Sequence, residues 1–352
     1  MDILILGGTG AMGTPLVQIL SKSDNKVWVT SRTTRQSHDN VEYITGDAHD
    51  NDFLDKILAR SYDVIIDFMS YETDELKRRI EGLLNKTCQY FFFSSSRVYA
   101  QTEDIITEDS NRILDICKDE EYISTDEYAL AKARQEDVLI NSGYRNWTII
   151  RPYITYNDYR IQMGAYEKEN WLYRALKGRT VVFPKEIADK YTTLTYGDDV
   201  AKCIYKLIGN EKAIGQIYNV MSDRYCKWSD IIELYKKAFY NVTGKELKVV
   251  FKNNVIELEK VWNKWQIIYD RLYNRRFSNK KLIETCDNIR FTEWETELEN
   301  CIANFIKHPK WRGFDWRYEA WSDRVTGELT PLNEIEGRRN KLRYIKWRFL
   351  KK

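Results

Sequence analysis

The sequence predicts an α/β fold: a Rossmann-type, doubly wound parallel sheet with a smaller, interleaved C-terminal lobe that would hold a substrate. Three observations predict it. A glycine-rich turn follows the first apolar run, short β-forming runs then alternate with helical or loop segments, and this alternation loosens from about residue 156. Such alternation, with nearly continuous apolar strands, is typical of a parallel sheet covered by helices on both faces.

The first strand and the turn after it predict a dinucleotide site. Residues 2–6 (DILIL) read as a strand, and Gly7, Gly10 and Gly13 lead into a helical pattern over 15–20. Gly7 permits a sharp turn, Gly10 lets the backbone approach a pyrophosphate, and Gly13 lets the helix pack closely on the strand. The helix N-terminus then favours the anion. Because the spacing is GxxGxxG rather than GxGxxG, a glycine turn without a ligand is the alternative.

The rest of the sheet is read from short runs of β-branched and aromatic residues. We expect the nucleotide-binding domain to cover residues 1–155 with a return segment over about 192–222, and the lobe to cover 156–191 and 223–352. No internal repeat or low-complexity linker marks a boundary. The further strands are predicted at 26–30, 41–45, 64–67, 90–94, 147–150 and 216–220, and later helices at 201–208 and 228–240.

Composition excludes several classes of protein. The net charge of +2 over 352 residues argues against a dedicated nucleic-acid binder, which needs a clearly basic face. The six cysteines form no CxxC motif and the three histidines are scattered, so neither a metal site nor a disulfide framework is expected. No leader and no membrane-length apolar run is found. The expected location is the cytoplasm, and a homodimer is left open.

Two motifs carry candidate chemistry. A buried strand ends in Ser94, Ser95 and Ser96, which places three hydroxyls at the edge of the sheet where ligands bind. Tyr128 and Lys132 follow, one helical turn apart, so the ammonium can favour the phenolate. Bringing a tyrosine pKa from about 10 toward 7 needs roughly 4 kcal/mol, which a cation and an oxidised nicotinamide ring nearby can supply.

The same spacing recurs at Tyr173 and Lys177, so the pattern alone is weak. The order of the motifs separates the two pairs. Tyr128 lies after the serine strand and before Arg151, whereas Tyr173 lies in the predicted lobe. Without the glycine turn, an exposed helix pair would be the default interpretation of Tyr128 and Lys132.

Taken together, these motifs resemble the extended short-chain dehydrogenase/reductases, the NAD(P)-dependent epimerase/dehydratase family that modifies nucleotide sugars. The resemblance covers about residues 1–240. Seven landmarks in one order are far more specific than any single motif. They are residues 7–13 (GGTGAMG), 46–47 (GD), 94–99 (SSSRVY), Tyr128 with Lys132, Arg151 with Pro152, 197–201 (GDDVA) and 218–220 (YNV).

The resemblance implies a role for each matching residue. Tyr128 would be the acid/base, Lys132 would bind the nicotinamide ribose and lower the tyrosine pKa, and Ser95 would hydrogen-bond the reacting oxygen, with Ser96 as the fallback. Asp47 would contact adenine, although an ordinary turn aspartate is the alternative. The cofactor-binding residues are predicted to be Gly7, Gly10, Met12, Gly13, Ser31, Arg32, Asp47, Lys132, Pro152, Tyr153 and Ile154, the last three lying against the nicotinamide.

The end of the second strand predicts which cofactor is used. Folds that prefer NAD place an acidic residue there to bind the ribose 2′-hydroxyl, whereas this chain has Ser31 and Arg32, with Arg35 nearby. An arginine there favours a 2′-phosphate through charge-assisted hydrogen bonds. We therefore expect NADP, with NAD as the alternative because a solvated arginine looks the same in sequence.

The residues after Ser95 bear on the reaction. The family's dehydratases carry an Asp-Glu pair there, whereas Ser96 and Arg97 follow here, so dehydration is not expected. Arg97 would meet a substrate phosphate or form a surface salt bridge. We expect an oxidoreductase of carbohydrate biosynthesis that acts on a nucleotide sugar, as an epimerase or 4-ketoreductase. The alternatives are a reductase of a non-sugar carbonyl, or a non-enzymatic member that binds a dinucleotide or RNA.

Residues 338–352 (RRNKLRYIKWRFLKK) form a basic aromatic tail with eight basic residues and no acidic one. The favoured interpretation is a terminal helix whose apolar face docks on its own lobe while the basic side chains reach water. Contact with an anionic membrane surface or with nucleic acid is the alternative. Trp311, Trp316 and Trp321 just before it would stack on sugars or fill the core of the lobe.

Overall fold

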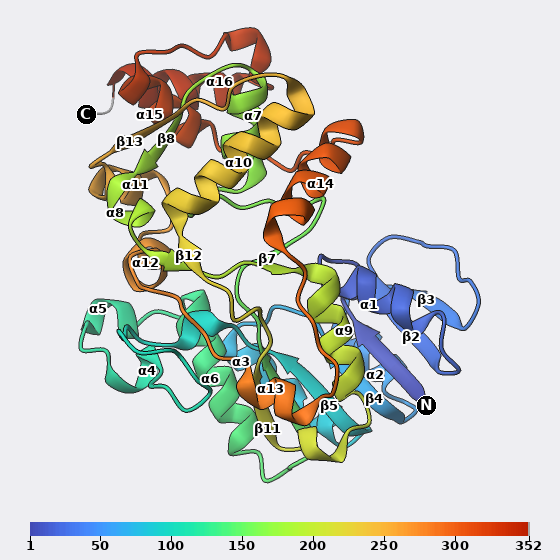
Figure 1. Cartoon of the computed structure of the whole chain (residues 1–352). Helices are drawn as coiled ribbons and strands as arrows, with labels where there is room; N and C mark the ends of the chain where they lie inside the picture. The colour runs from blue at the N-terminus through green and yellow to red at the C-terminus, as the bar shows by residue number, and fades with distance from the viewer. Residues whose placement is uncertain (351–352) are drawn as a thin grey trace. The chain divides into compact units, whose positions relative to one another are not determined.

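The computed structural model describes residues 1–350 and divides the chain into two compact units (Figure 1). The first unit comprises Met1–Thr155, Thr193–Arg224 and Arg276–Thr292. The second comprises Tyr156–Thr192, Tyr225–Arg275 and the residues from Glu293 onward. The chain therefore leaves the first unit and returns to it twice, and the short strand β7 (Thr155–Tyr156) lies where it first leaves.

A seven-stranded sheet forms the first unit, with the strand order β11-β6-β5-β4-β1-β2-β3. Every neighbouring pair is parallel, which confirms the predicted doubly wound fold. The order reverses between β1 and β4, and ligands of such sheets bind at this switch point. The strands are β1 (Asp2–Leu6), β2 (Lys26–Ser31), β3 (Val41–Thr45), β4 (Tyr62–Asp67), β5 (Thr87–Phe93), β6 (Trp147–Arg151) and β11 (Gln216–Asn219); β10 (Thr195–Tyr196) lies outside this sheet.

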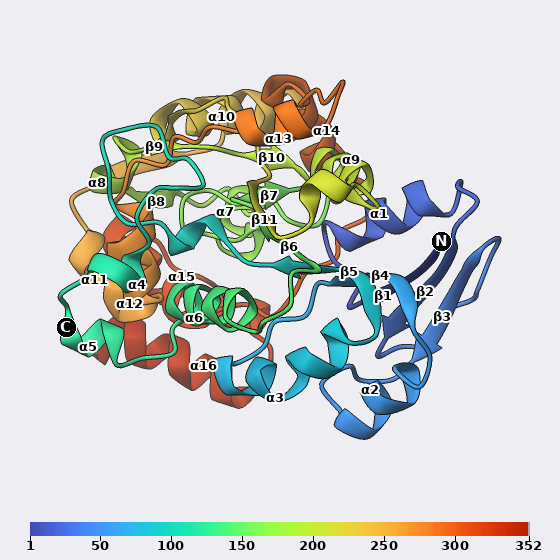
Figure 2. The same cartoon turned by 90° about the horizontal axis from the view of Figure 1, so that it is seen from below.

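Helices cover both faces of this sheet, as Figure 2 shows. Successive side chains of β1 point to opposite faces: Ile3 and Ile5 pack with α1 and α9, whereas Leu4 and Leu6 pack with α2 and α3. Two apolar cores result. The helices of this unit are α1 (Gly13–Leu20), α2 (Asn51–Ile57), α3 (Thr73–Leu84), α4 (Ile113–Ile116), α5 (Glu120–Ile123), α6 (Tyr128–Ile140), α9 (Gly197–Leu207) and α13 (Lys280–Thr285), with 3-10 turns η1 (Ser96–Val98) and η2 (Glu211–Ala213).

The prediction was wrong for residues 276–292, which it assigned to the lobe but which belong to the sheet unit. Leu282 and Cys286 are buried in the core that α1 and α9 share. The segment is also tied to α9, because the Thr292 N–H and hydroxyl donate to the two carboxylate oxygens of Asp199, at 2.6 and 3.0 Å. A six-residue helix is too short for its apolar spacing to reveal which core it joins.

The second unit is mainly helical. It contains two strand pairs, β8 parallel to β13 and β9 antiparallel to β12. Its strands are β8 (Val181–Pro184), β9 (Tyr191–Thr192), β12 (Cys226–Lys227) and β13 (Val249–Lys252). Its α-helices are α7 (Lys168–Leu176), α8 (Lys185–Ala188), α10 (Trp228–Thr243), α11 (Val255–Val261), α12 (Lys264–Gln266), α14 (Trp294–Lys307), α15 (Trp316–Thr326) and α16 (Arg338–Ile345). It also has two π-helical segments, η3 (Ile267–Arg271) and η5 (Lys346–Leu350), and one 3-10 turn, η4 (Leu332–Glu334).

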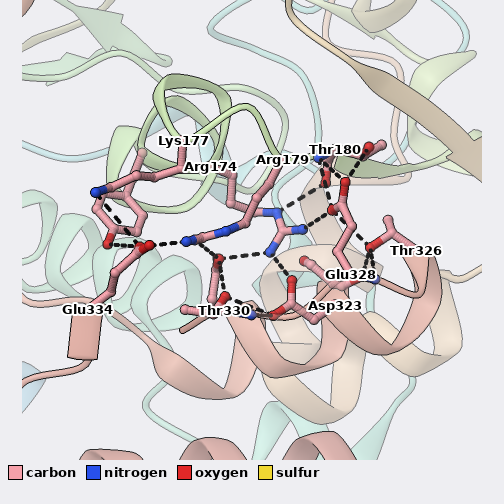
Figure 3. A network of polar contacts seen from close by, with 12 residues as sticks. Arg174, Lys177, Arg179, Thr180, Asp323, Thr326, Glu328, Thr330 and Glu334 are labelled. Atoms are coloured by element: carbon pink, nitrogen blue, oxygen red, sulfur yellow. Dashed lines mark hydrogen bonds and ion pairs between the residues drawn. The ribbon is translucent and has the colours of Figure 1, made fainter. Parts of the chain in front are cut away.

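A charged network joins α7 to α15 within this unit (Figure 3). The guanidinium of Arg174 is fully buried and lies 2.8 Å from Asp323 and 2.8 Å from Glu328. Arg179 forms a 2.8 Å ion pair with Glu319. Replacing one member would leave its partner buried and unpaired, which is costly, so we assign these groups to the architecture of the lobe.

The basic tail begins with α16, which docks on α15 as the favoured interpretation expects. Tyr344 is fully buried and donates its hydroxyl to Asp323 Oδ2 at 2.6 Å. Its ring lies in a small core with Trp316 and Ile335, so Trp316 fills the lobe. Leu342 on the outer side is 67% exposed. Lys351 and Lys352 lie outside the described residues, and none of the helices within 1–350 is long and apolar enough to cross a membrane.

Candidate active site

The glycine turn after β1 has the geometry that a nucleotide-binding turn needs. Gly7 has a φ of +70°, a conformation that side chains rarely adopt. A Cβ at Gly13 would lie 2.6 Å from the carbonyl carbon of Gly8, so only glycine lets α1 begin this close to the turn. A Cβ at Gly10 would meet nothing within 4 Å. The backbone at Gly10 is therefore open to an approaching ligand.

A pocket of about 330 Å³ opens beside this turn. It lies at the carboxyl ends of β1, β2, β3 and β4, which is the position expected for a ligand at the switch point. Five predicted cofactor residues line it: Gly7, Gly10, Ser31, Arg32 and Asp47. The other lining residues are Thr9, Thr30, Gly46, Ala48, His49, Phe68, Met69 and Ser70.

The predicted adenosine-binding residues differ in their surroundings. Arg32 is exposed at the pocket, whereas Ser31 is buried and its hydroxyl lies 3.3 Å from Arg35 Nε. Asp47 lines the pocket, and its carboxylate also accepts the N–H of His49 at 3.0 Å. The same carboxylate can therefore stabilise the turn after β3 and contact a ligand. Met12 is not among the residues that line the pocket; it packs against the core on the α1 side instead.

Several pocket residues escaped the sequence analysis. His49 seemed only one of three scattered histidines, yet it lines the pocket with its Nδ1 2.7 Å from Glu75 Oε1. Residues 68–70 line it because β4 lies next to β1. The signal was present, since loops after adjacent parallel strands share one edge of the sheet. Within residues 1–350, no three or more histidine, cysteine or acidic side chains gather into a metal site.

The hydroxyls of the three serines after β5 differ in their hydrogen bonds. Ser96, the second candidate for binding the reacting oxygen, is fully buried and donates its hydroxyl to the backbone oxygen of Arg151 at 3.0 Å. Its hydroxyl hydrogen is therefore already used within the fold. Ser95 accepts the N–H of Arg97 at 3.2 Å and starts η1. Ser94 is buried, and its hydroxyl makes no hydrogen bond within residues 1–350. Ser95 therefore remains the better candidate for the residue that would hydrogen-bond the reacting oxygen of the substrate.

Tyr128 is the first residue of α6, and its side chain is 42% exposed. Glu127 caps the helix by accepting the N–H of Ala129 at 2.9 Å. The guanidinium of Arg97 lies 5.3 Å from the centre of the Tyr128 ring and forms a 2.7 Å ion pair with Glu127. Arg97 thus links the serine loop to the start of α6, and its ion pair is largely buried rather than on the surface.

Lys132 is 3% exposed, which is unusual for a lysine. Its Nζ lies 4.7 Å from the centre of the Phe92 ring and makes no hydrogen bond or ion pair with any residue from 1 to 350. Burial lowers the pKa of Lys132 to about 8, against the opposing charges of Asp67 and Glu136. A buried ammonium without a partner is costly, and it is the kind of group that a ligand hydroxyl would satisfy.

The residues expected to lie against the nicotinamide follow β6. The backbone oxygen of Pro152 accepts the N–H of Ser96 at 3.0 Å, so this loop lies beside the serine loop. Tyr153 and Ile154 are buried, and the Tyr153 ring packs 5.0 Å from that of Phe277. Both side chains are therefore held in place by packing within the first unit.

The second tyrosine-lysine pair has a different environment. Tyr173 donates its hydroxyl to Glu334 at 2.9 Å, and Lys177 lies 3.8 Å from the same carboxylate, as Figure 3 shows for the labelled Lys177 and Glu334. Burial and the Glu334 carboxylate raise the pKa of Tyr173 to about 12. This phenol is held in its protonated form, which is the opposite of what an acid/base near neutral pH needs.

Comparison with known proteins identifies the family to which the chain belongs. Residues 3–220, more than half of the chain, match the model of the NAD dependent epimerase/dehydratase family. The chain belongs to this family. The resemblance seen in the sequence is thereby confirmed, and the matched region contains the glycine turn, the serine loop and α6.

A relative in Arabidopsis thaliana is the chloroplast stem-loop binding protein of 41 kDa b, 27% identical over 253 residues. The match covers 67% of this chain but 62% of the relative, so the chain spans less than two thirds of the relative's length.

Solved structures share the fold at low sequence identity. WbmH of Bordetella bronchiseptica, solved with NAD+, has a TM-score of 0.67 at 13% identity and covers 88% of this chain and 99% of its own. The dTDP-glucose 4,6-dehydratase of Bacillus anthracis, with NAD, gives 0.67 at 16% over 88% and 98%. The UDP-glucuronic acid 4-epimerase of Bacillus cereus, with NAD, gives 0.65 at 16% over 88% and 97%.

Proposed function

We propose that this protein is an NAD(P)-dependent oxidoreductase that acts on a nucleotide-activated sugar, as an epimerase or a 4-ketoreductase. One observation carries the proposal: one turn after the exposed Tyr128, on a helix that packs against the serine loop, Lys132 is buried and makes no hydrogen bond or ion pair among the described residues. A residue set kept only for structure has no reason to bury a lone ammonium. The sugar-nucleotide enzymes with the same fold support the substrate class.

The residues present fit a nicotinamide dinucleotide. Gly10 leaves the backbone open, and the pocket beside it has room for an adenosine moiety with Asp47 at its wall. Ribose hydroxyls would give the buried Lys132 ammonium the hydrogen-bond partners that residues 1–350 do not supply. The backbone oxygen of Pro152 accepts the Ser96 N–H, which supports a nicotinamide position next to the serine loop. When bound, the dinucleotide would accept or supply a hydride at the sugar carbon.

The protein groups would then move the proton. Tyr128, as the phenolate, takes the hydroxyl proton while the sugar carbon loses its hydride, so a carbonyl forms. In the reverse direction the Tyr128 phenol returns the proton to the carbonyl oxygen. Ser95 holds that oxygen by a hydrogen bond, and the Lys132 ammonium stabilises the phenolate. An epimerase completes both directions on one bound sugar, and a ketoreductase performs only the second.

The residues after Ser95 favour these two reactions over water elimination. Elimination needs a second acid and base beside the acid/base tyrosine. Here Ser96 is committed to the Arg151 backbone oxygen, and Arg97 is paired with Glu127. The Glu127 carboxylate also accepts from the Tyr122 hydroxyl at 3.1 Å, so it is not free to serve as that acid.

A panel of nucleotide sugars tests the substrate class. We expect one or more UDP- or dTDP-sugars to raise the melting temperature beyond the rise given by NADP+ or NAD+ alone, because binding to the native state stabilises it. If no nucleotide sugar binds with either cofactor, while stem-loop RNA does, the non-enzymatic alternative replaces this proposal.

Cofactor choice gives a separate prediction. We propose NADP as the preferred cofactor, because Arg32 lies exposed at the pocket where NAD-preferring folds carry an acidic residue. Arg32→Ala should weaken NADP+ binding by about 1 to 3 kcal/mol and leave NAD+ binding nearly unchanged. Calorimetry measures both, and Arg78→Ala, a change at an exposed arginine outside the pocket, is the control. Equal affinities of the wild type for the two cofactors would refute the preference.

A further inference from the structure

We propose that Asp67, at the end of β4, is a positioning residue for Lys132: without touching the lysine, its carboxylate charge favours the ammonium on the face of the sheet where both groups lie. This inference rests on the proposed function, because it concerns the lysine assigned to the cofactor and the phenolate. Asp67 lies outside every motif that identified the site. Four observations carry it.

The register of the sheet places the two groups on one face. Asp67 pairs with Phe92 on β5, and partners in a parallel ladder point to the same side of the sheet. The Lys132 Nζ lies 4.7 Å from the Phe92 ring. Tyr90, two residues before Phe92 and therefore on that face, donates its hydroxyl to Asp67 at 2.7 Å. Lys132 and Asp67 thus meet on the face that α3 and α6 cover (Figure 2).

The Asp67 carboxylate is built into the fold. It is 1% exposed and accepts three hydrogen bonds: from Tyr90 at 2.7 Å, from the Tyr71 hydroxyl at 2.9 Å and from the Met69 N–H at 2.9 Å. Burial raises the pKa of this carboxyl, and the three donors and Lys132 oppose that rise. Three fixed donors favour the ionised form and hold it in one orientation.

Asp67 is the anion near Lys132 that no arginine neutralises. Glu136, on the same helix as Lys132, is bound by Arg151 at 2.8 and 2.7 Å and lies 3.4 Å from Arg112. Within residues 1–350, no basic side chain lies within ion-pair distance of Asp67. Two cations on neighbouring elements are themselves occupied: Arg79 of α3 pairs with Glu75 and stacks on Tyr71, and Arg97 of η1 pairs with Glu127.

The same residue also reaches the nucleotide pocket. Met69, which donates its N–H to Asp67, lines the pocket beside the glycine turn. Asp67 therefore fixes one wall of the predicted adenosine site through Oδ1 and accepts from both tyrosines through Oδ2. This arrangement links the wall of the nucleotide pocket to the face of the sheet on which Lys132 lies.

The pH dependence of cofactor binding tests the inference. Asp67→Asn keeps the size of the side chain but removes the charge, so the ammonium should lose its proton more easily. The alkaline limbs of NADP+ binding and of kcat/KM should both move to lower pH, by about one unit. A purely structural role would lower binding by the same factor at every pH. Asp63→Asn, an exposed aspartate on the same strand, is the control and should leave both limbs in place.

Tyr90→Phe removes one donor from the carboxylate and should move the limbs the same way by less, which keeps the test available if Asp67→Asn does not fold. An unshifted limb in a folded Asp67→Asn protein, or in Tyr90→Phe where only that variant folds, overturns the role of Asp67. A wild type that binds no dinucleotide at any pH overturns the proposed function instead.

Discussion

Tyr128→Phe is expected to lower kcat by about a hundredfold or more while cofactor affinity changes little. The hydroxyl is the group assigned to proton transfer, and a positioned acid/base is worth this much. The ring would keep its contact with the Arg97 guanidinium, 5.3 Å away, and α6 would keep its Glu127 cap. Steady-state kinetics on the nucleotide sugar identified by the panel, with cofactor titrations beside them, measure both quantities.

Tyr173→Phe is the matched control, because Tyr173 has the same spacing to a lysine. Its hydroxyl is bound to Glu334 in the network of the lobe, so its loss should lower stability slightly and leave turnover almost unchanged. Wild-type turnover in Tyr128→Phe, or loss of turnover in Tyr173→Phe alone, would contradict the assignment of the site.

Lys132→Met is expected to stabilise the protein at neutral pH and to abolish its activity. Burial lowers the pKa of Lys132 to about 8 from an ordinary value of 10.5. At pH 7 the native state must therefore keep a proton that it holds less tightly than the unfolded chain does. This costs about 3 kcal/mol at roughly 1.4 kcal/mol per pKa unit. Methionine fills the same space without that cost, and it offers nothing to ribose or to a phenolate.

The pH dependence has a definite sign. Between about pH 8 and 10.5 the unfolded chain binds the Lys132 proton and the native protein does not, so the stability of the wild type rises with pH in that window. Below pH 8 the full cost is present. Denaturant unfolding of both proteins should show a gap in favour of Lys132→Met at pH 7 that closes toward pH 10.5. A variant less stable than the wild type at pH 7 would count against a net cost of burying the Lys132 ammonium.

Local patterns predicted the geometry of the glycine turn. Gly7, Gly10 and Gly13 were read correctly as a sharp turn, an open backbone and a close helix, because each role depends on a few consecutive residues. The order of seven landmarks along the chain, Ser95, Tyr128 and Lys132 among them, predicted the family that the comparison confirmed. The strands were found because continuous apolar runs are a strong signal for a parallel sheet.

What the sequence did not reveal depends on neighbours that are distant in the chain. Asp67 reads as the last residue of an apolar strand, and only the pairing of β4 with β5 brings Tyr90 and Lys132 to it. His49 joins the pocket because β3 ends beside β2, and Ser96 is lost as a candidate because β6 presents the Arg151 carbonyl to it. None of these contacts corresponds to a motif with a fixed spacing in the sequence.

Hydride transfer from a nucleotide sugar tests the central claim most directly. A sugar carrying deuterium at the reacting carbon would be mixed with the protein and oxidised cofactor in a single turnover, and the absorbance of the reduced nicotinamide and the position of the label would be followed. We predict that the wild type moves the label to the cofactor, and that Tyr128→Phe does so at least about a hundredfold more slowly. A wild type that binds both molecules but transfers no label, with any sugar that binds, would contradict the account.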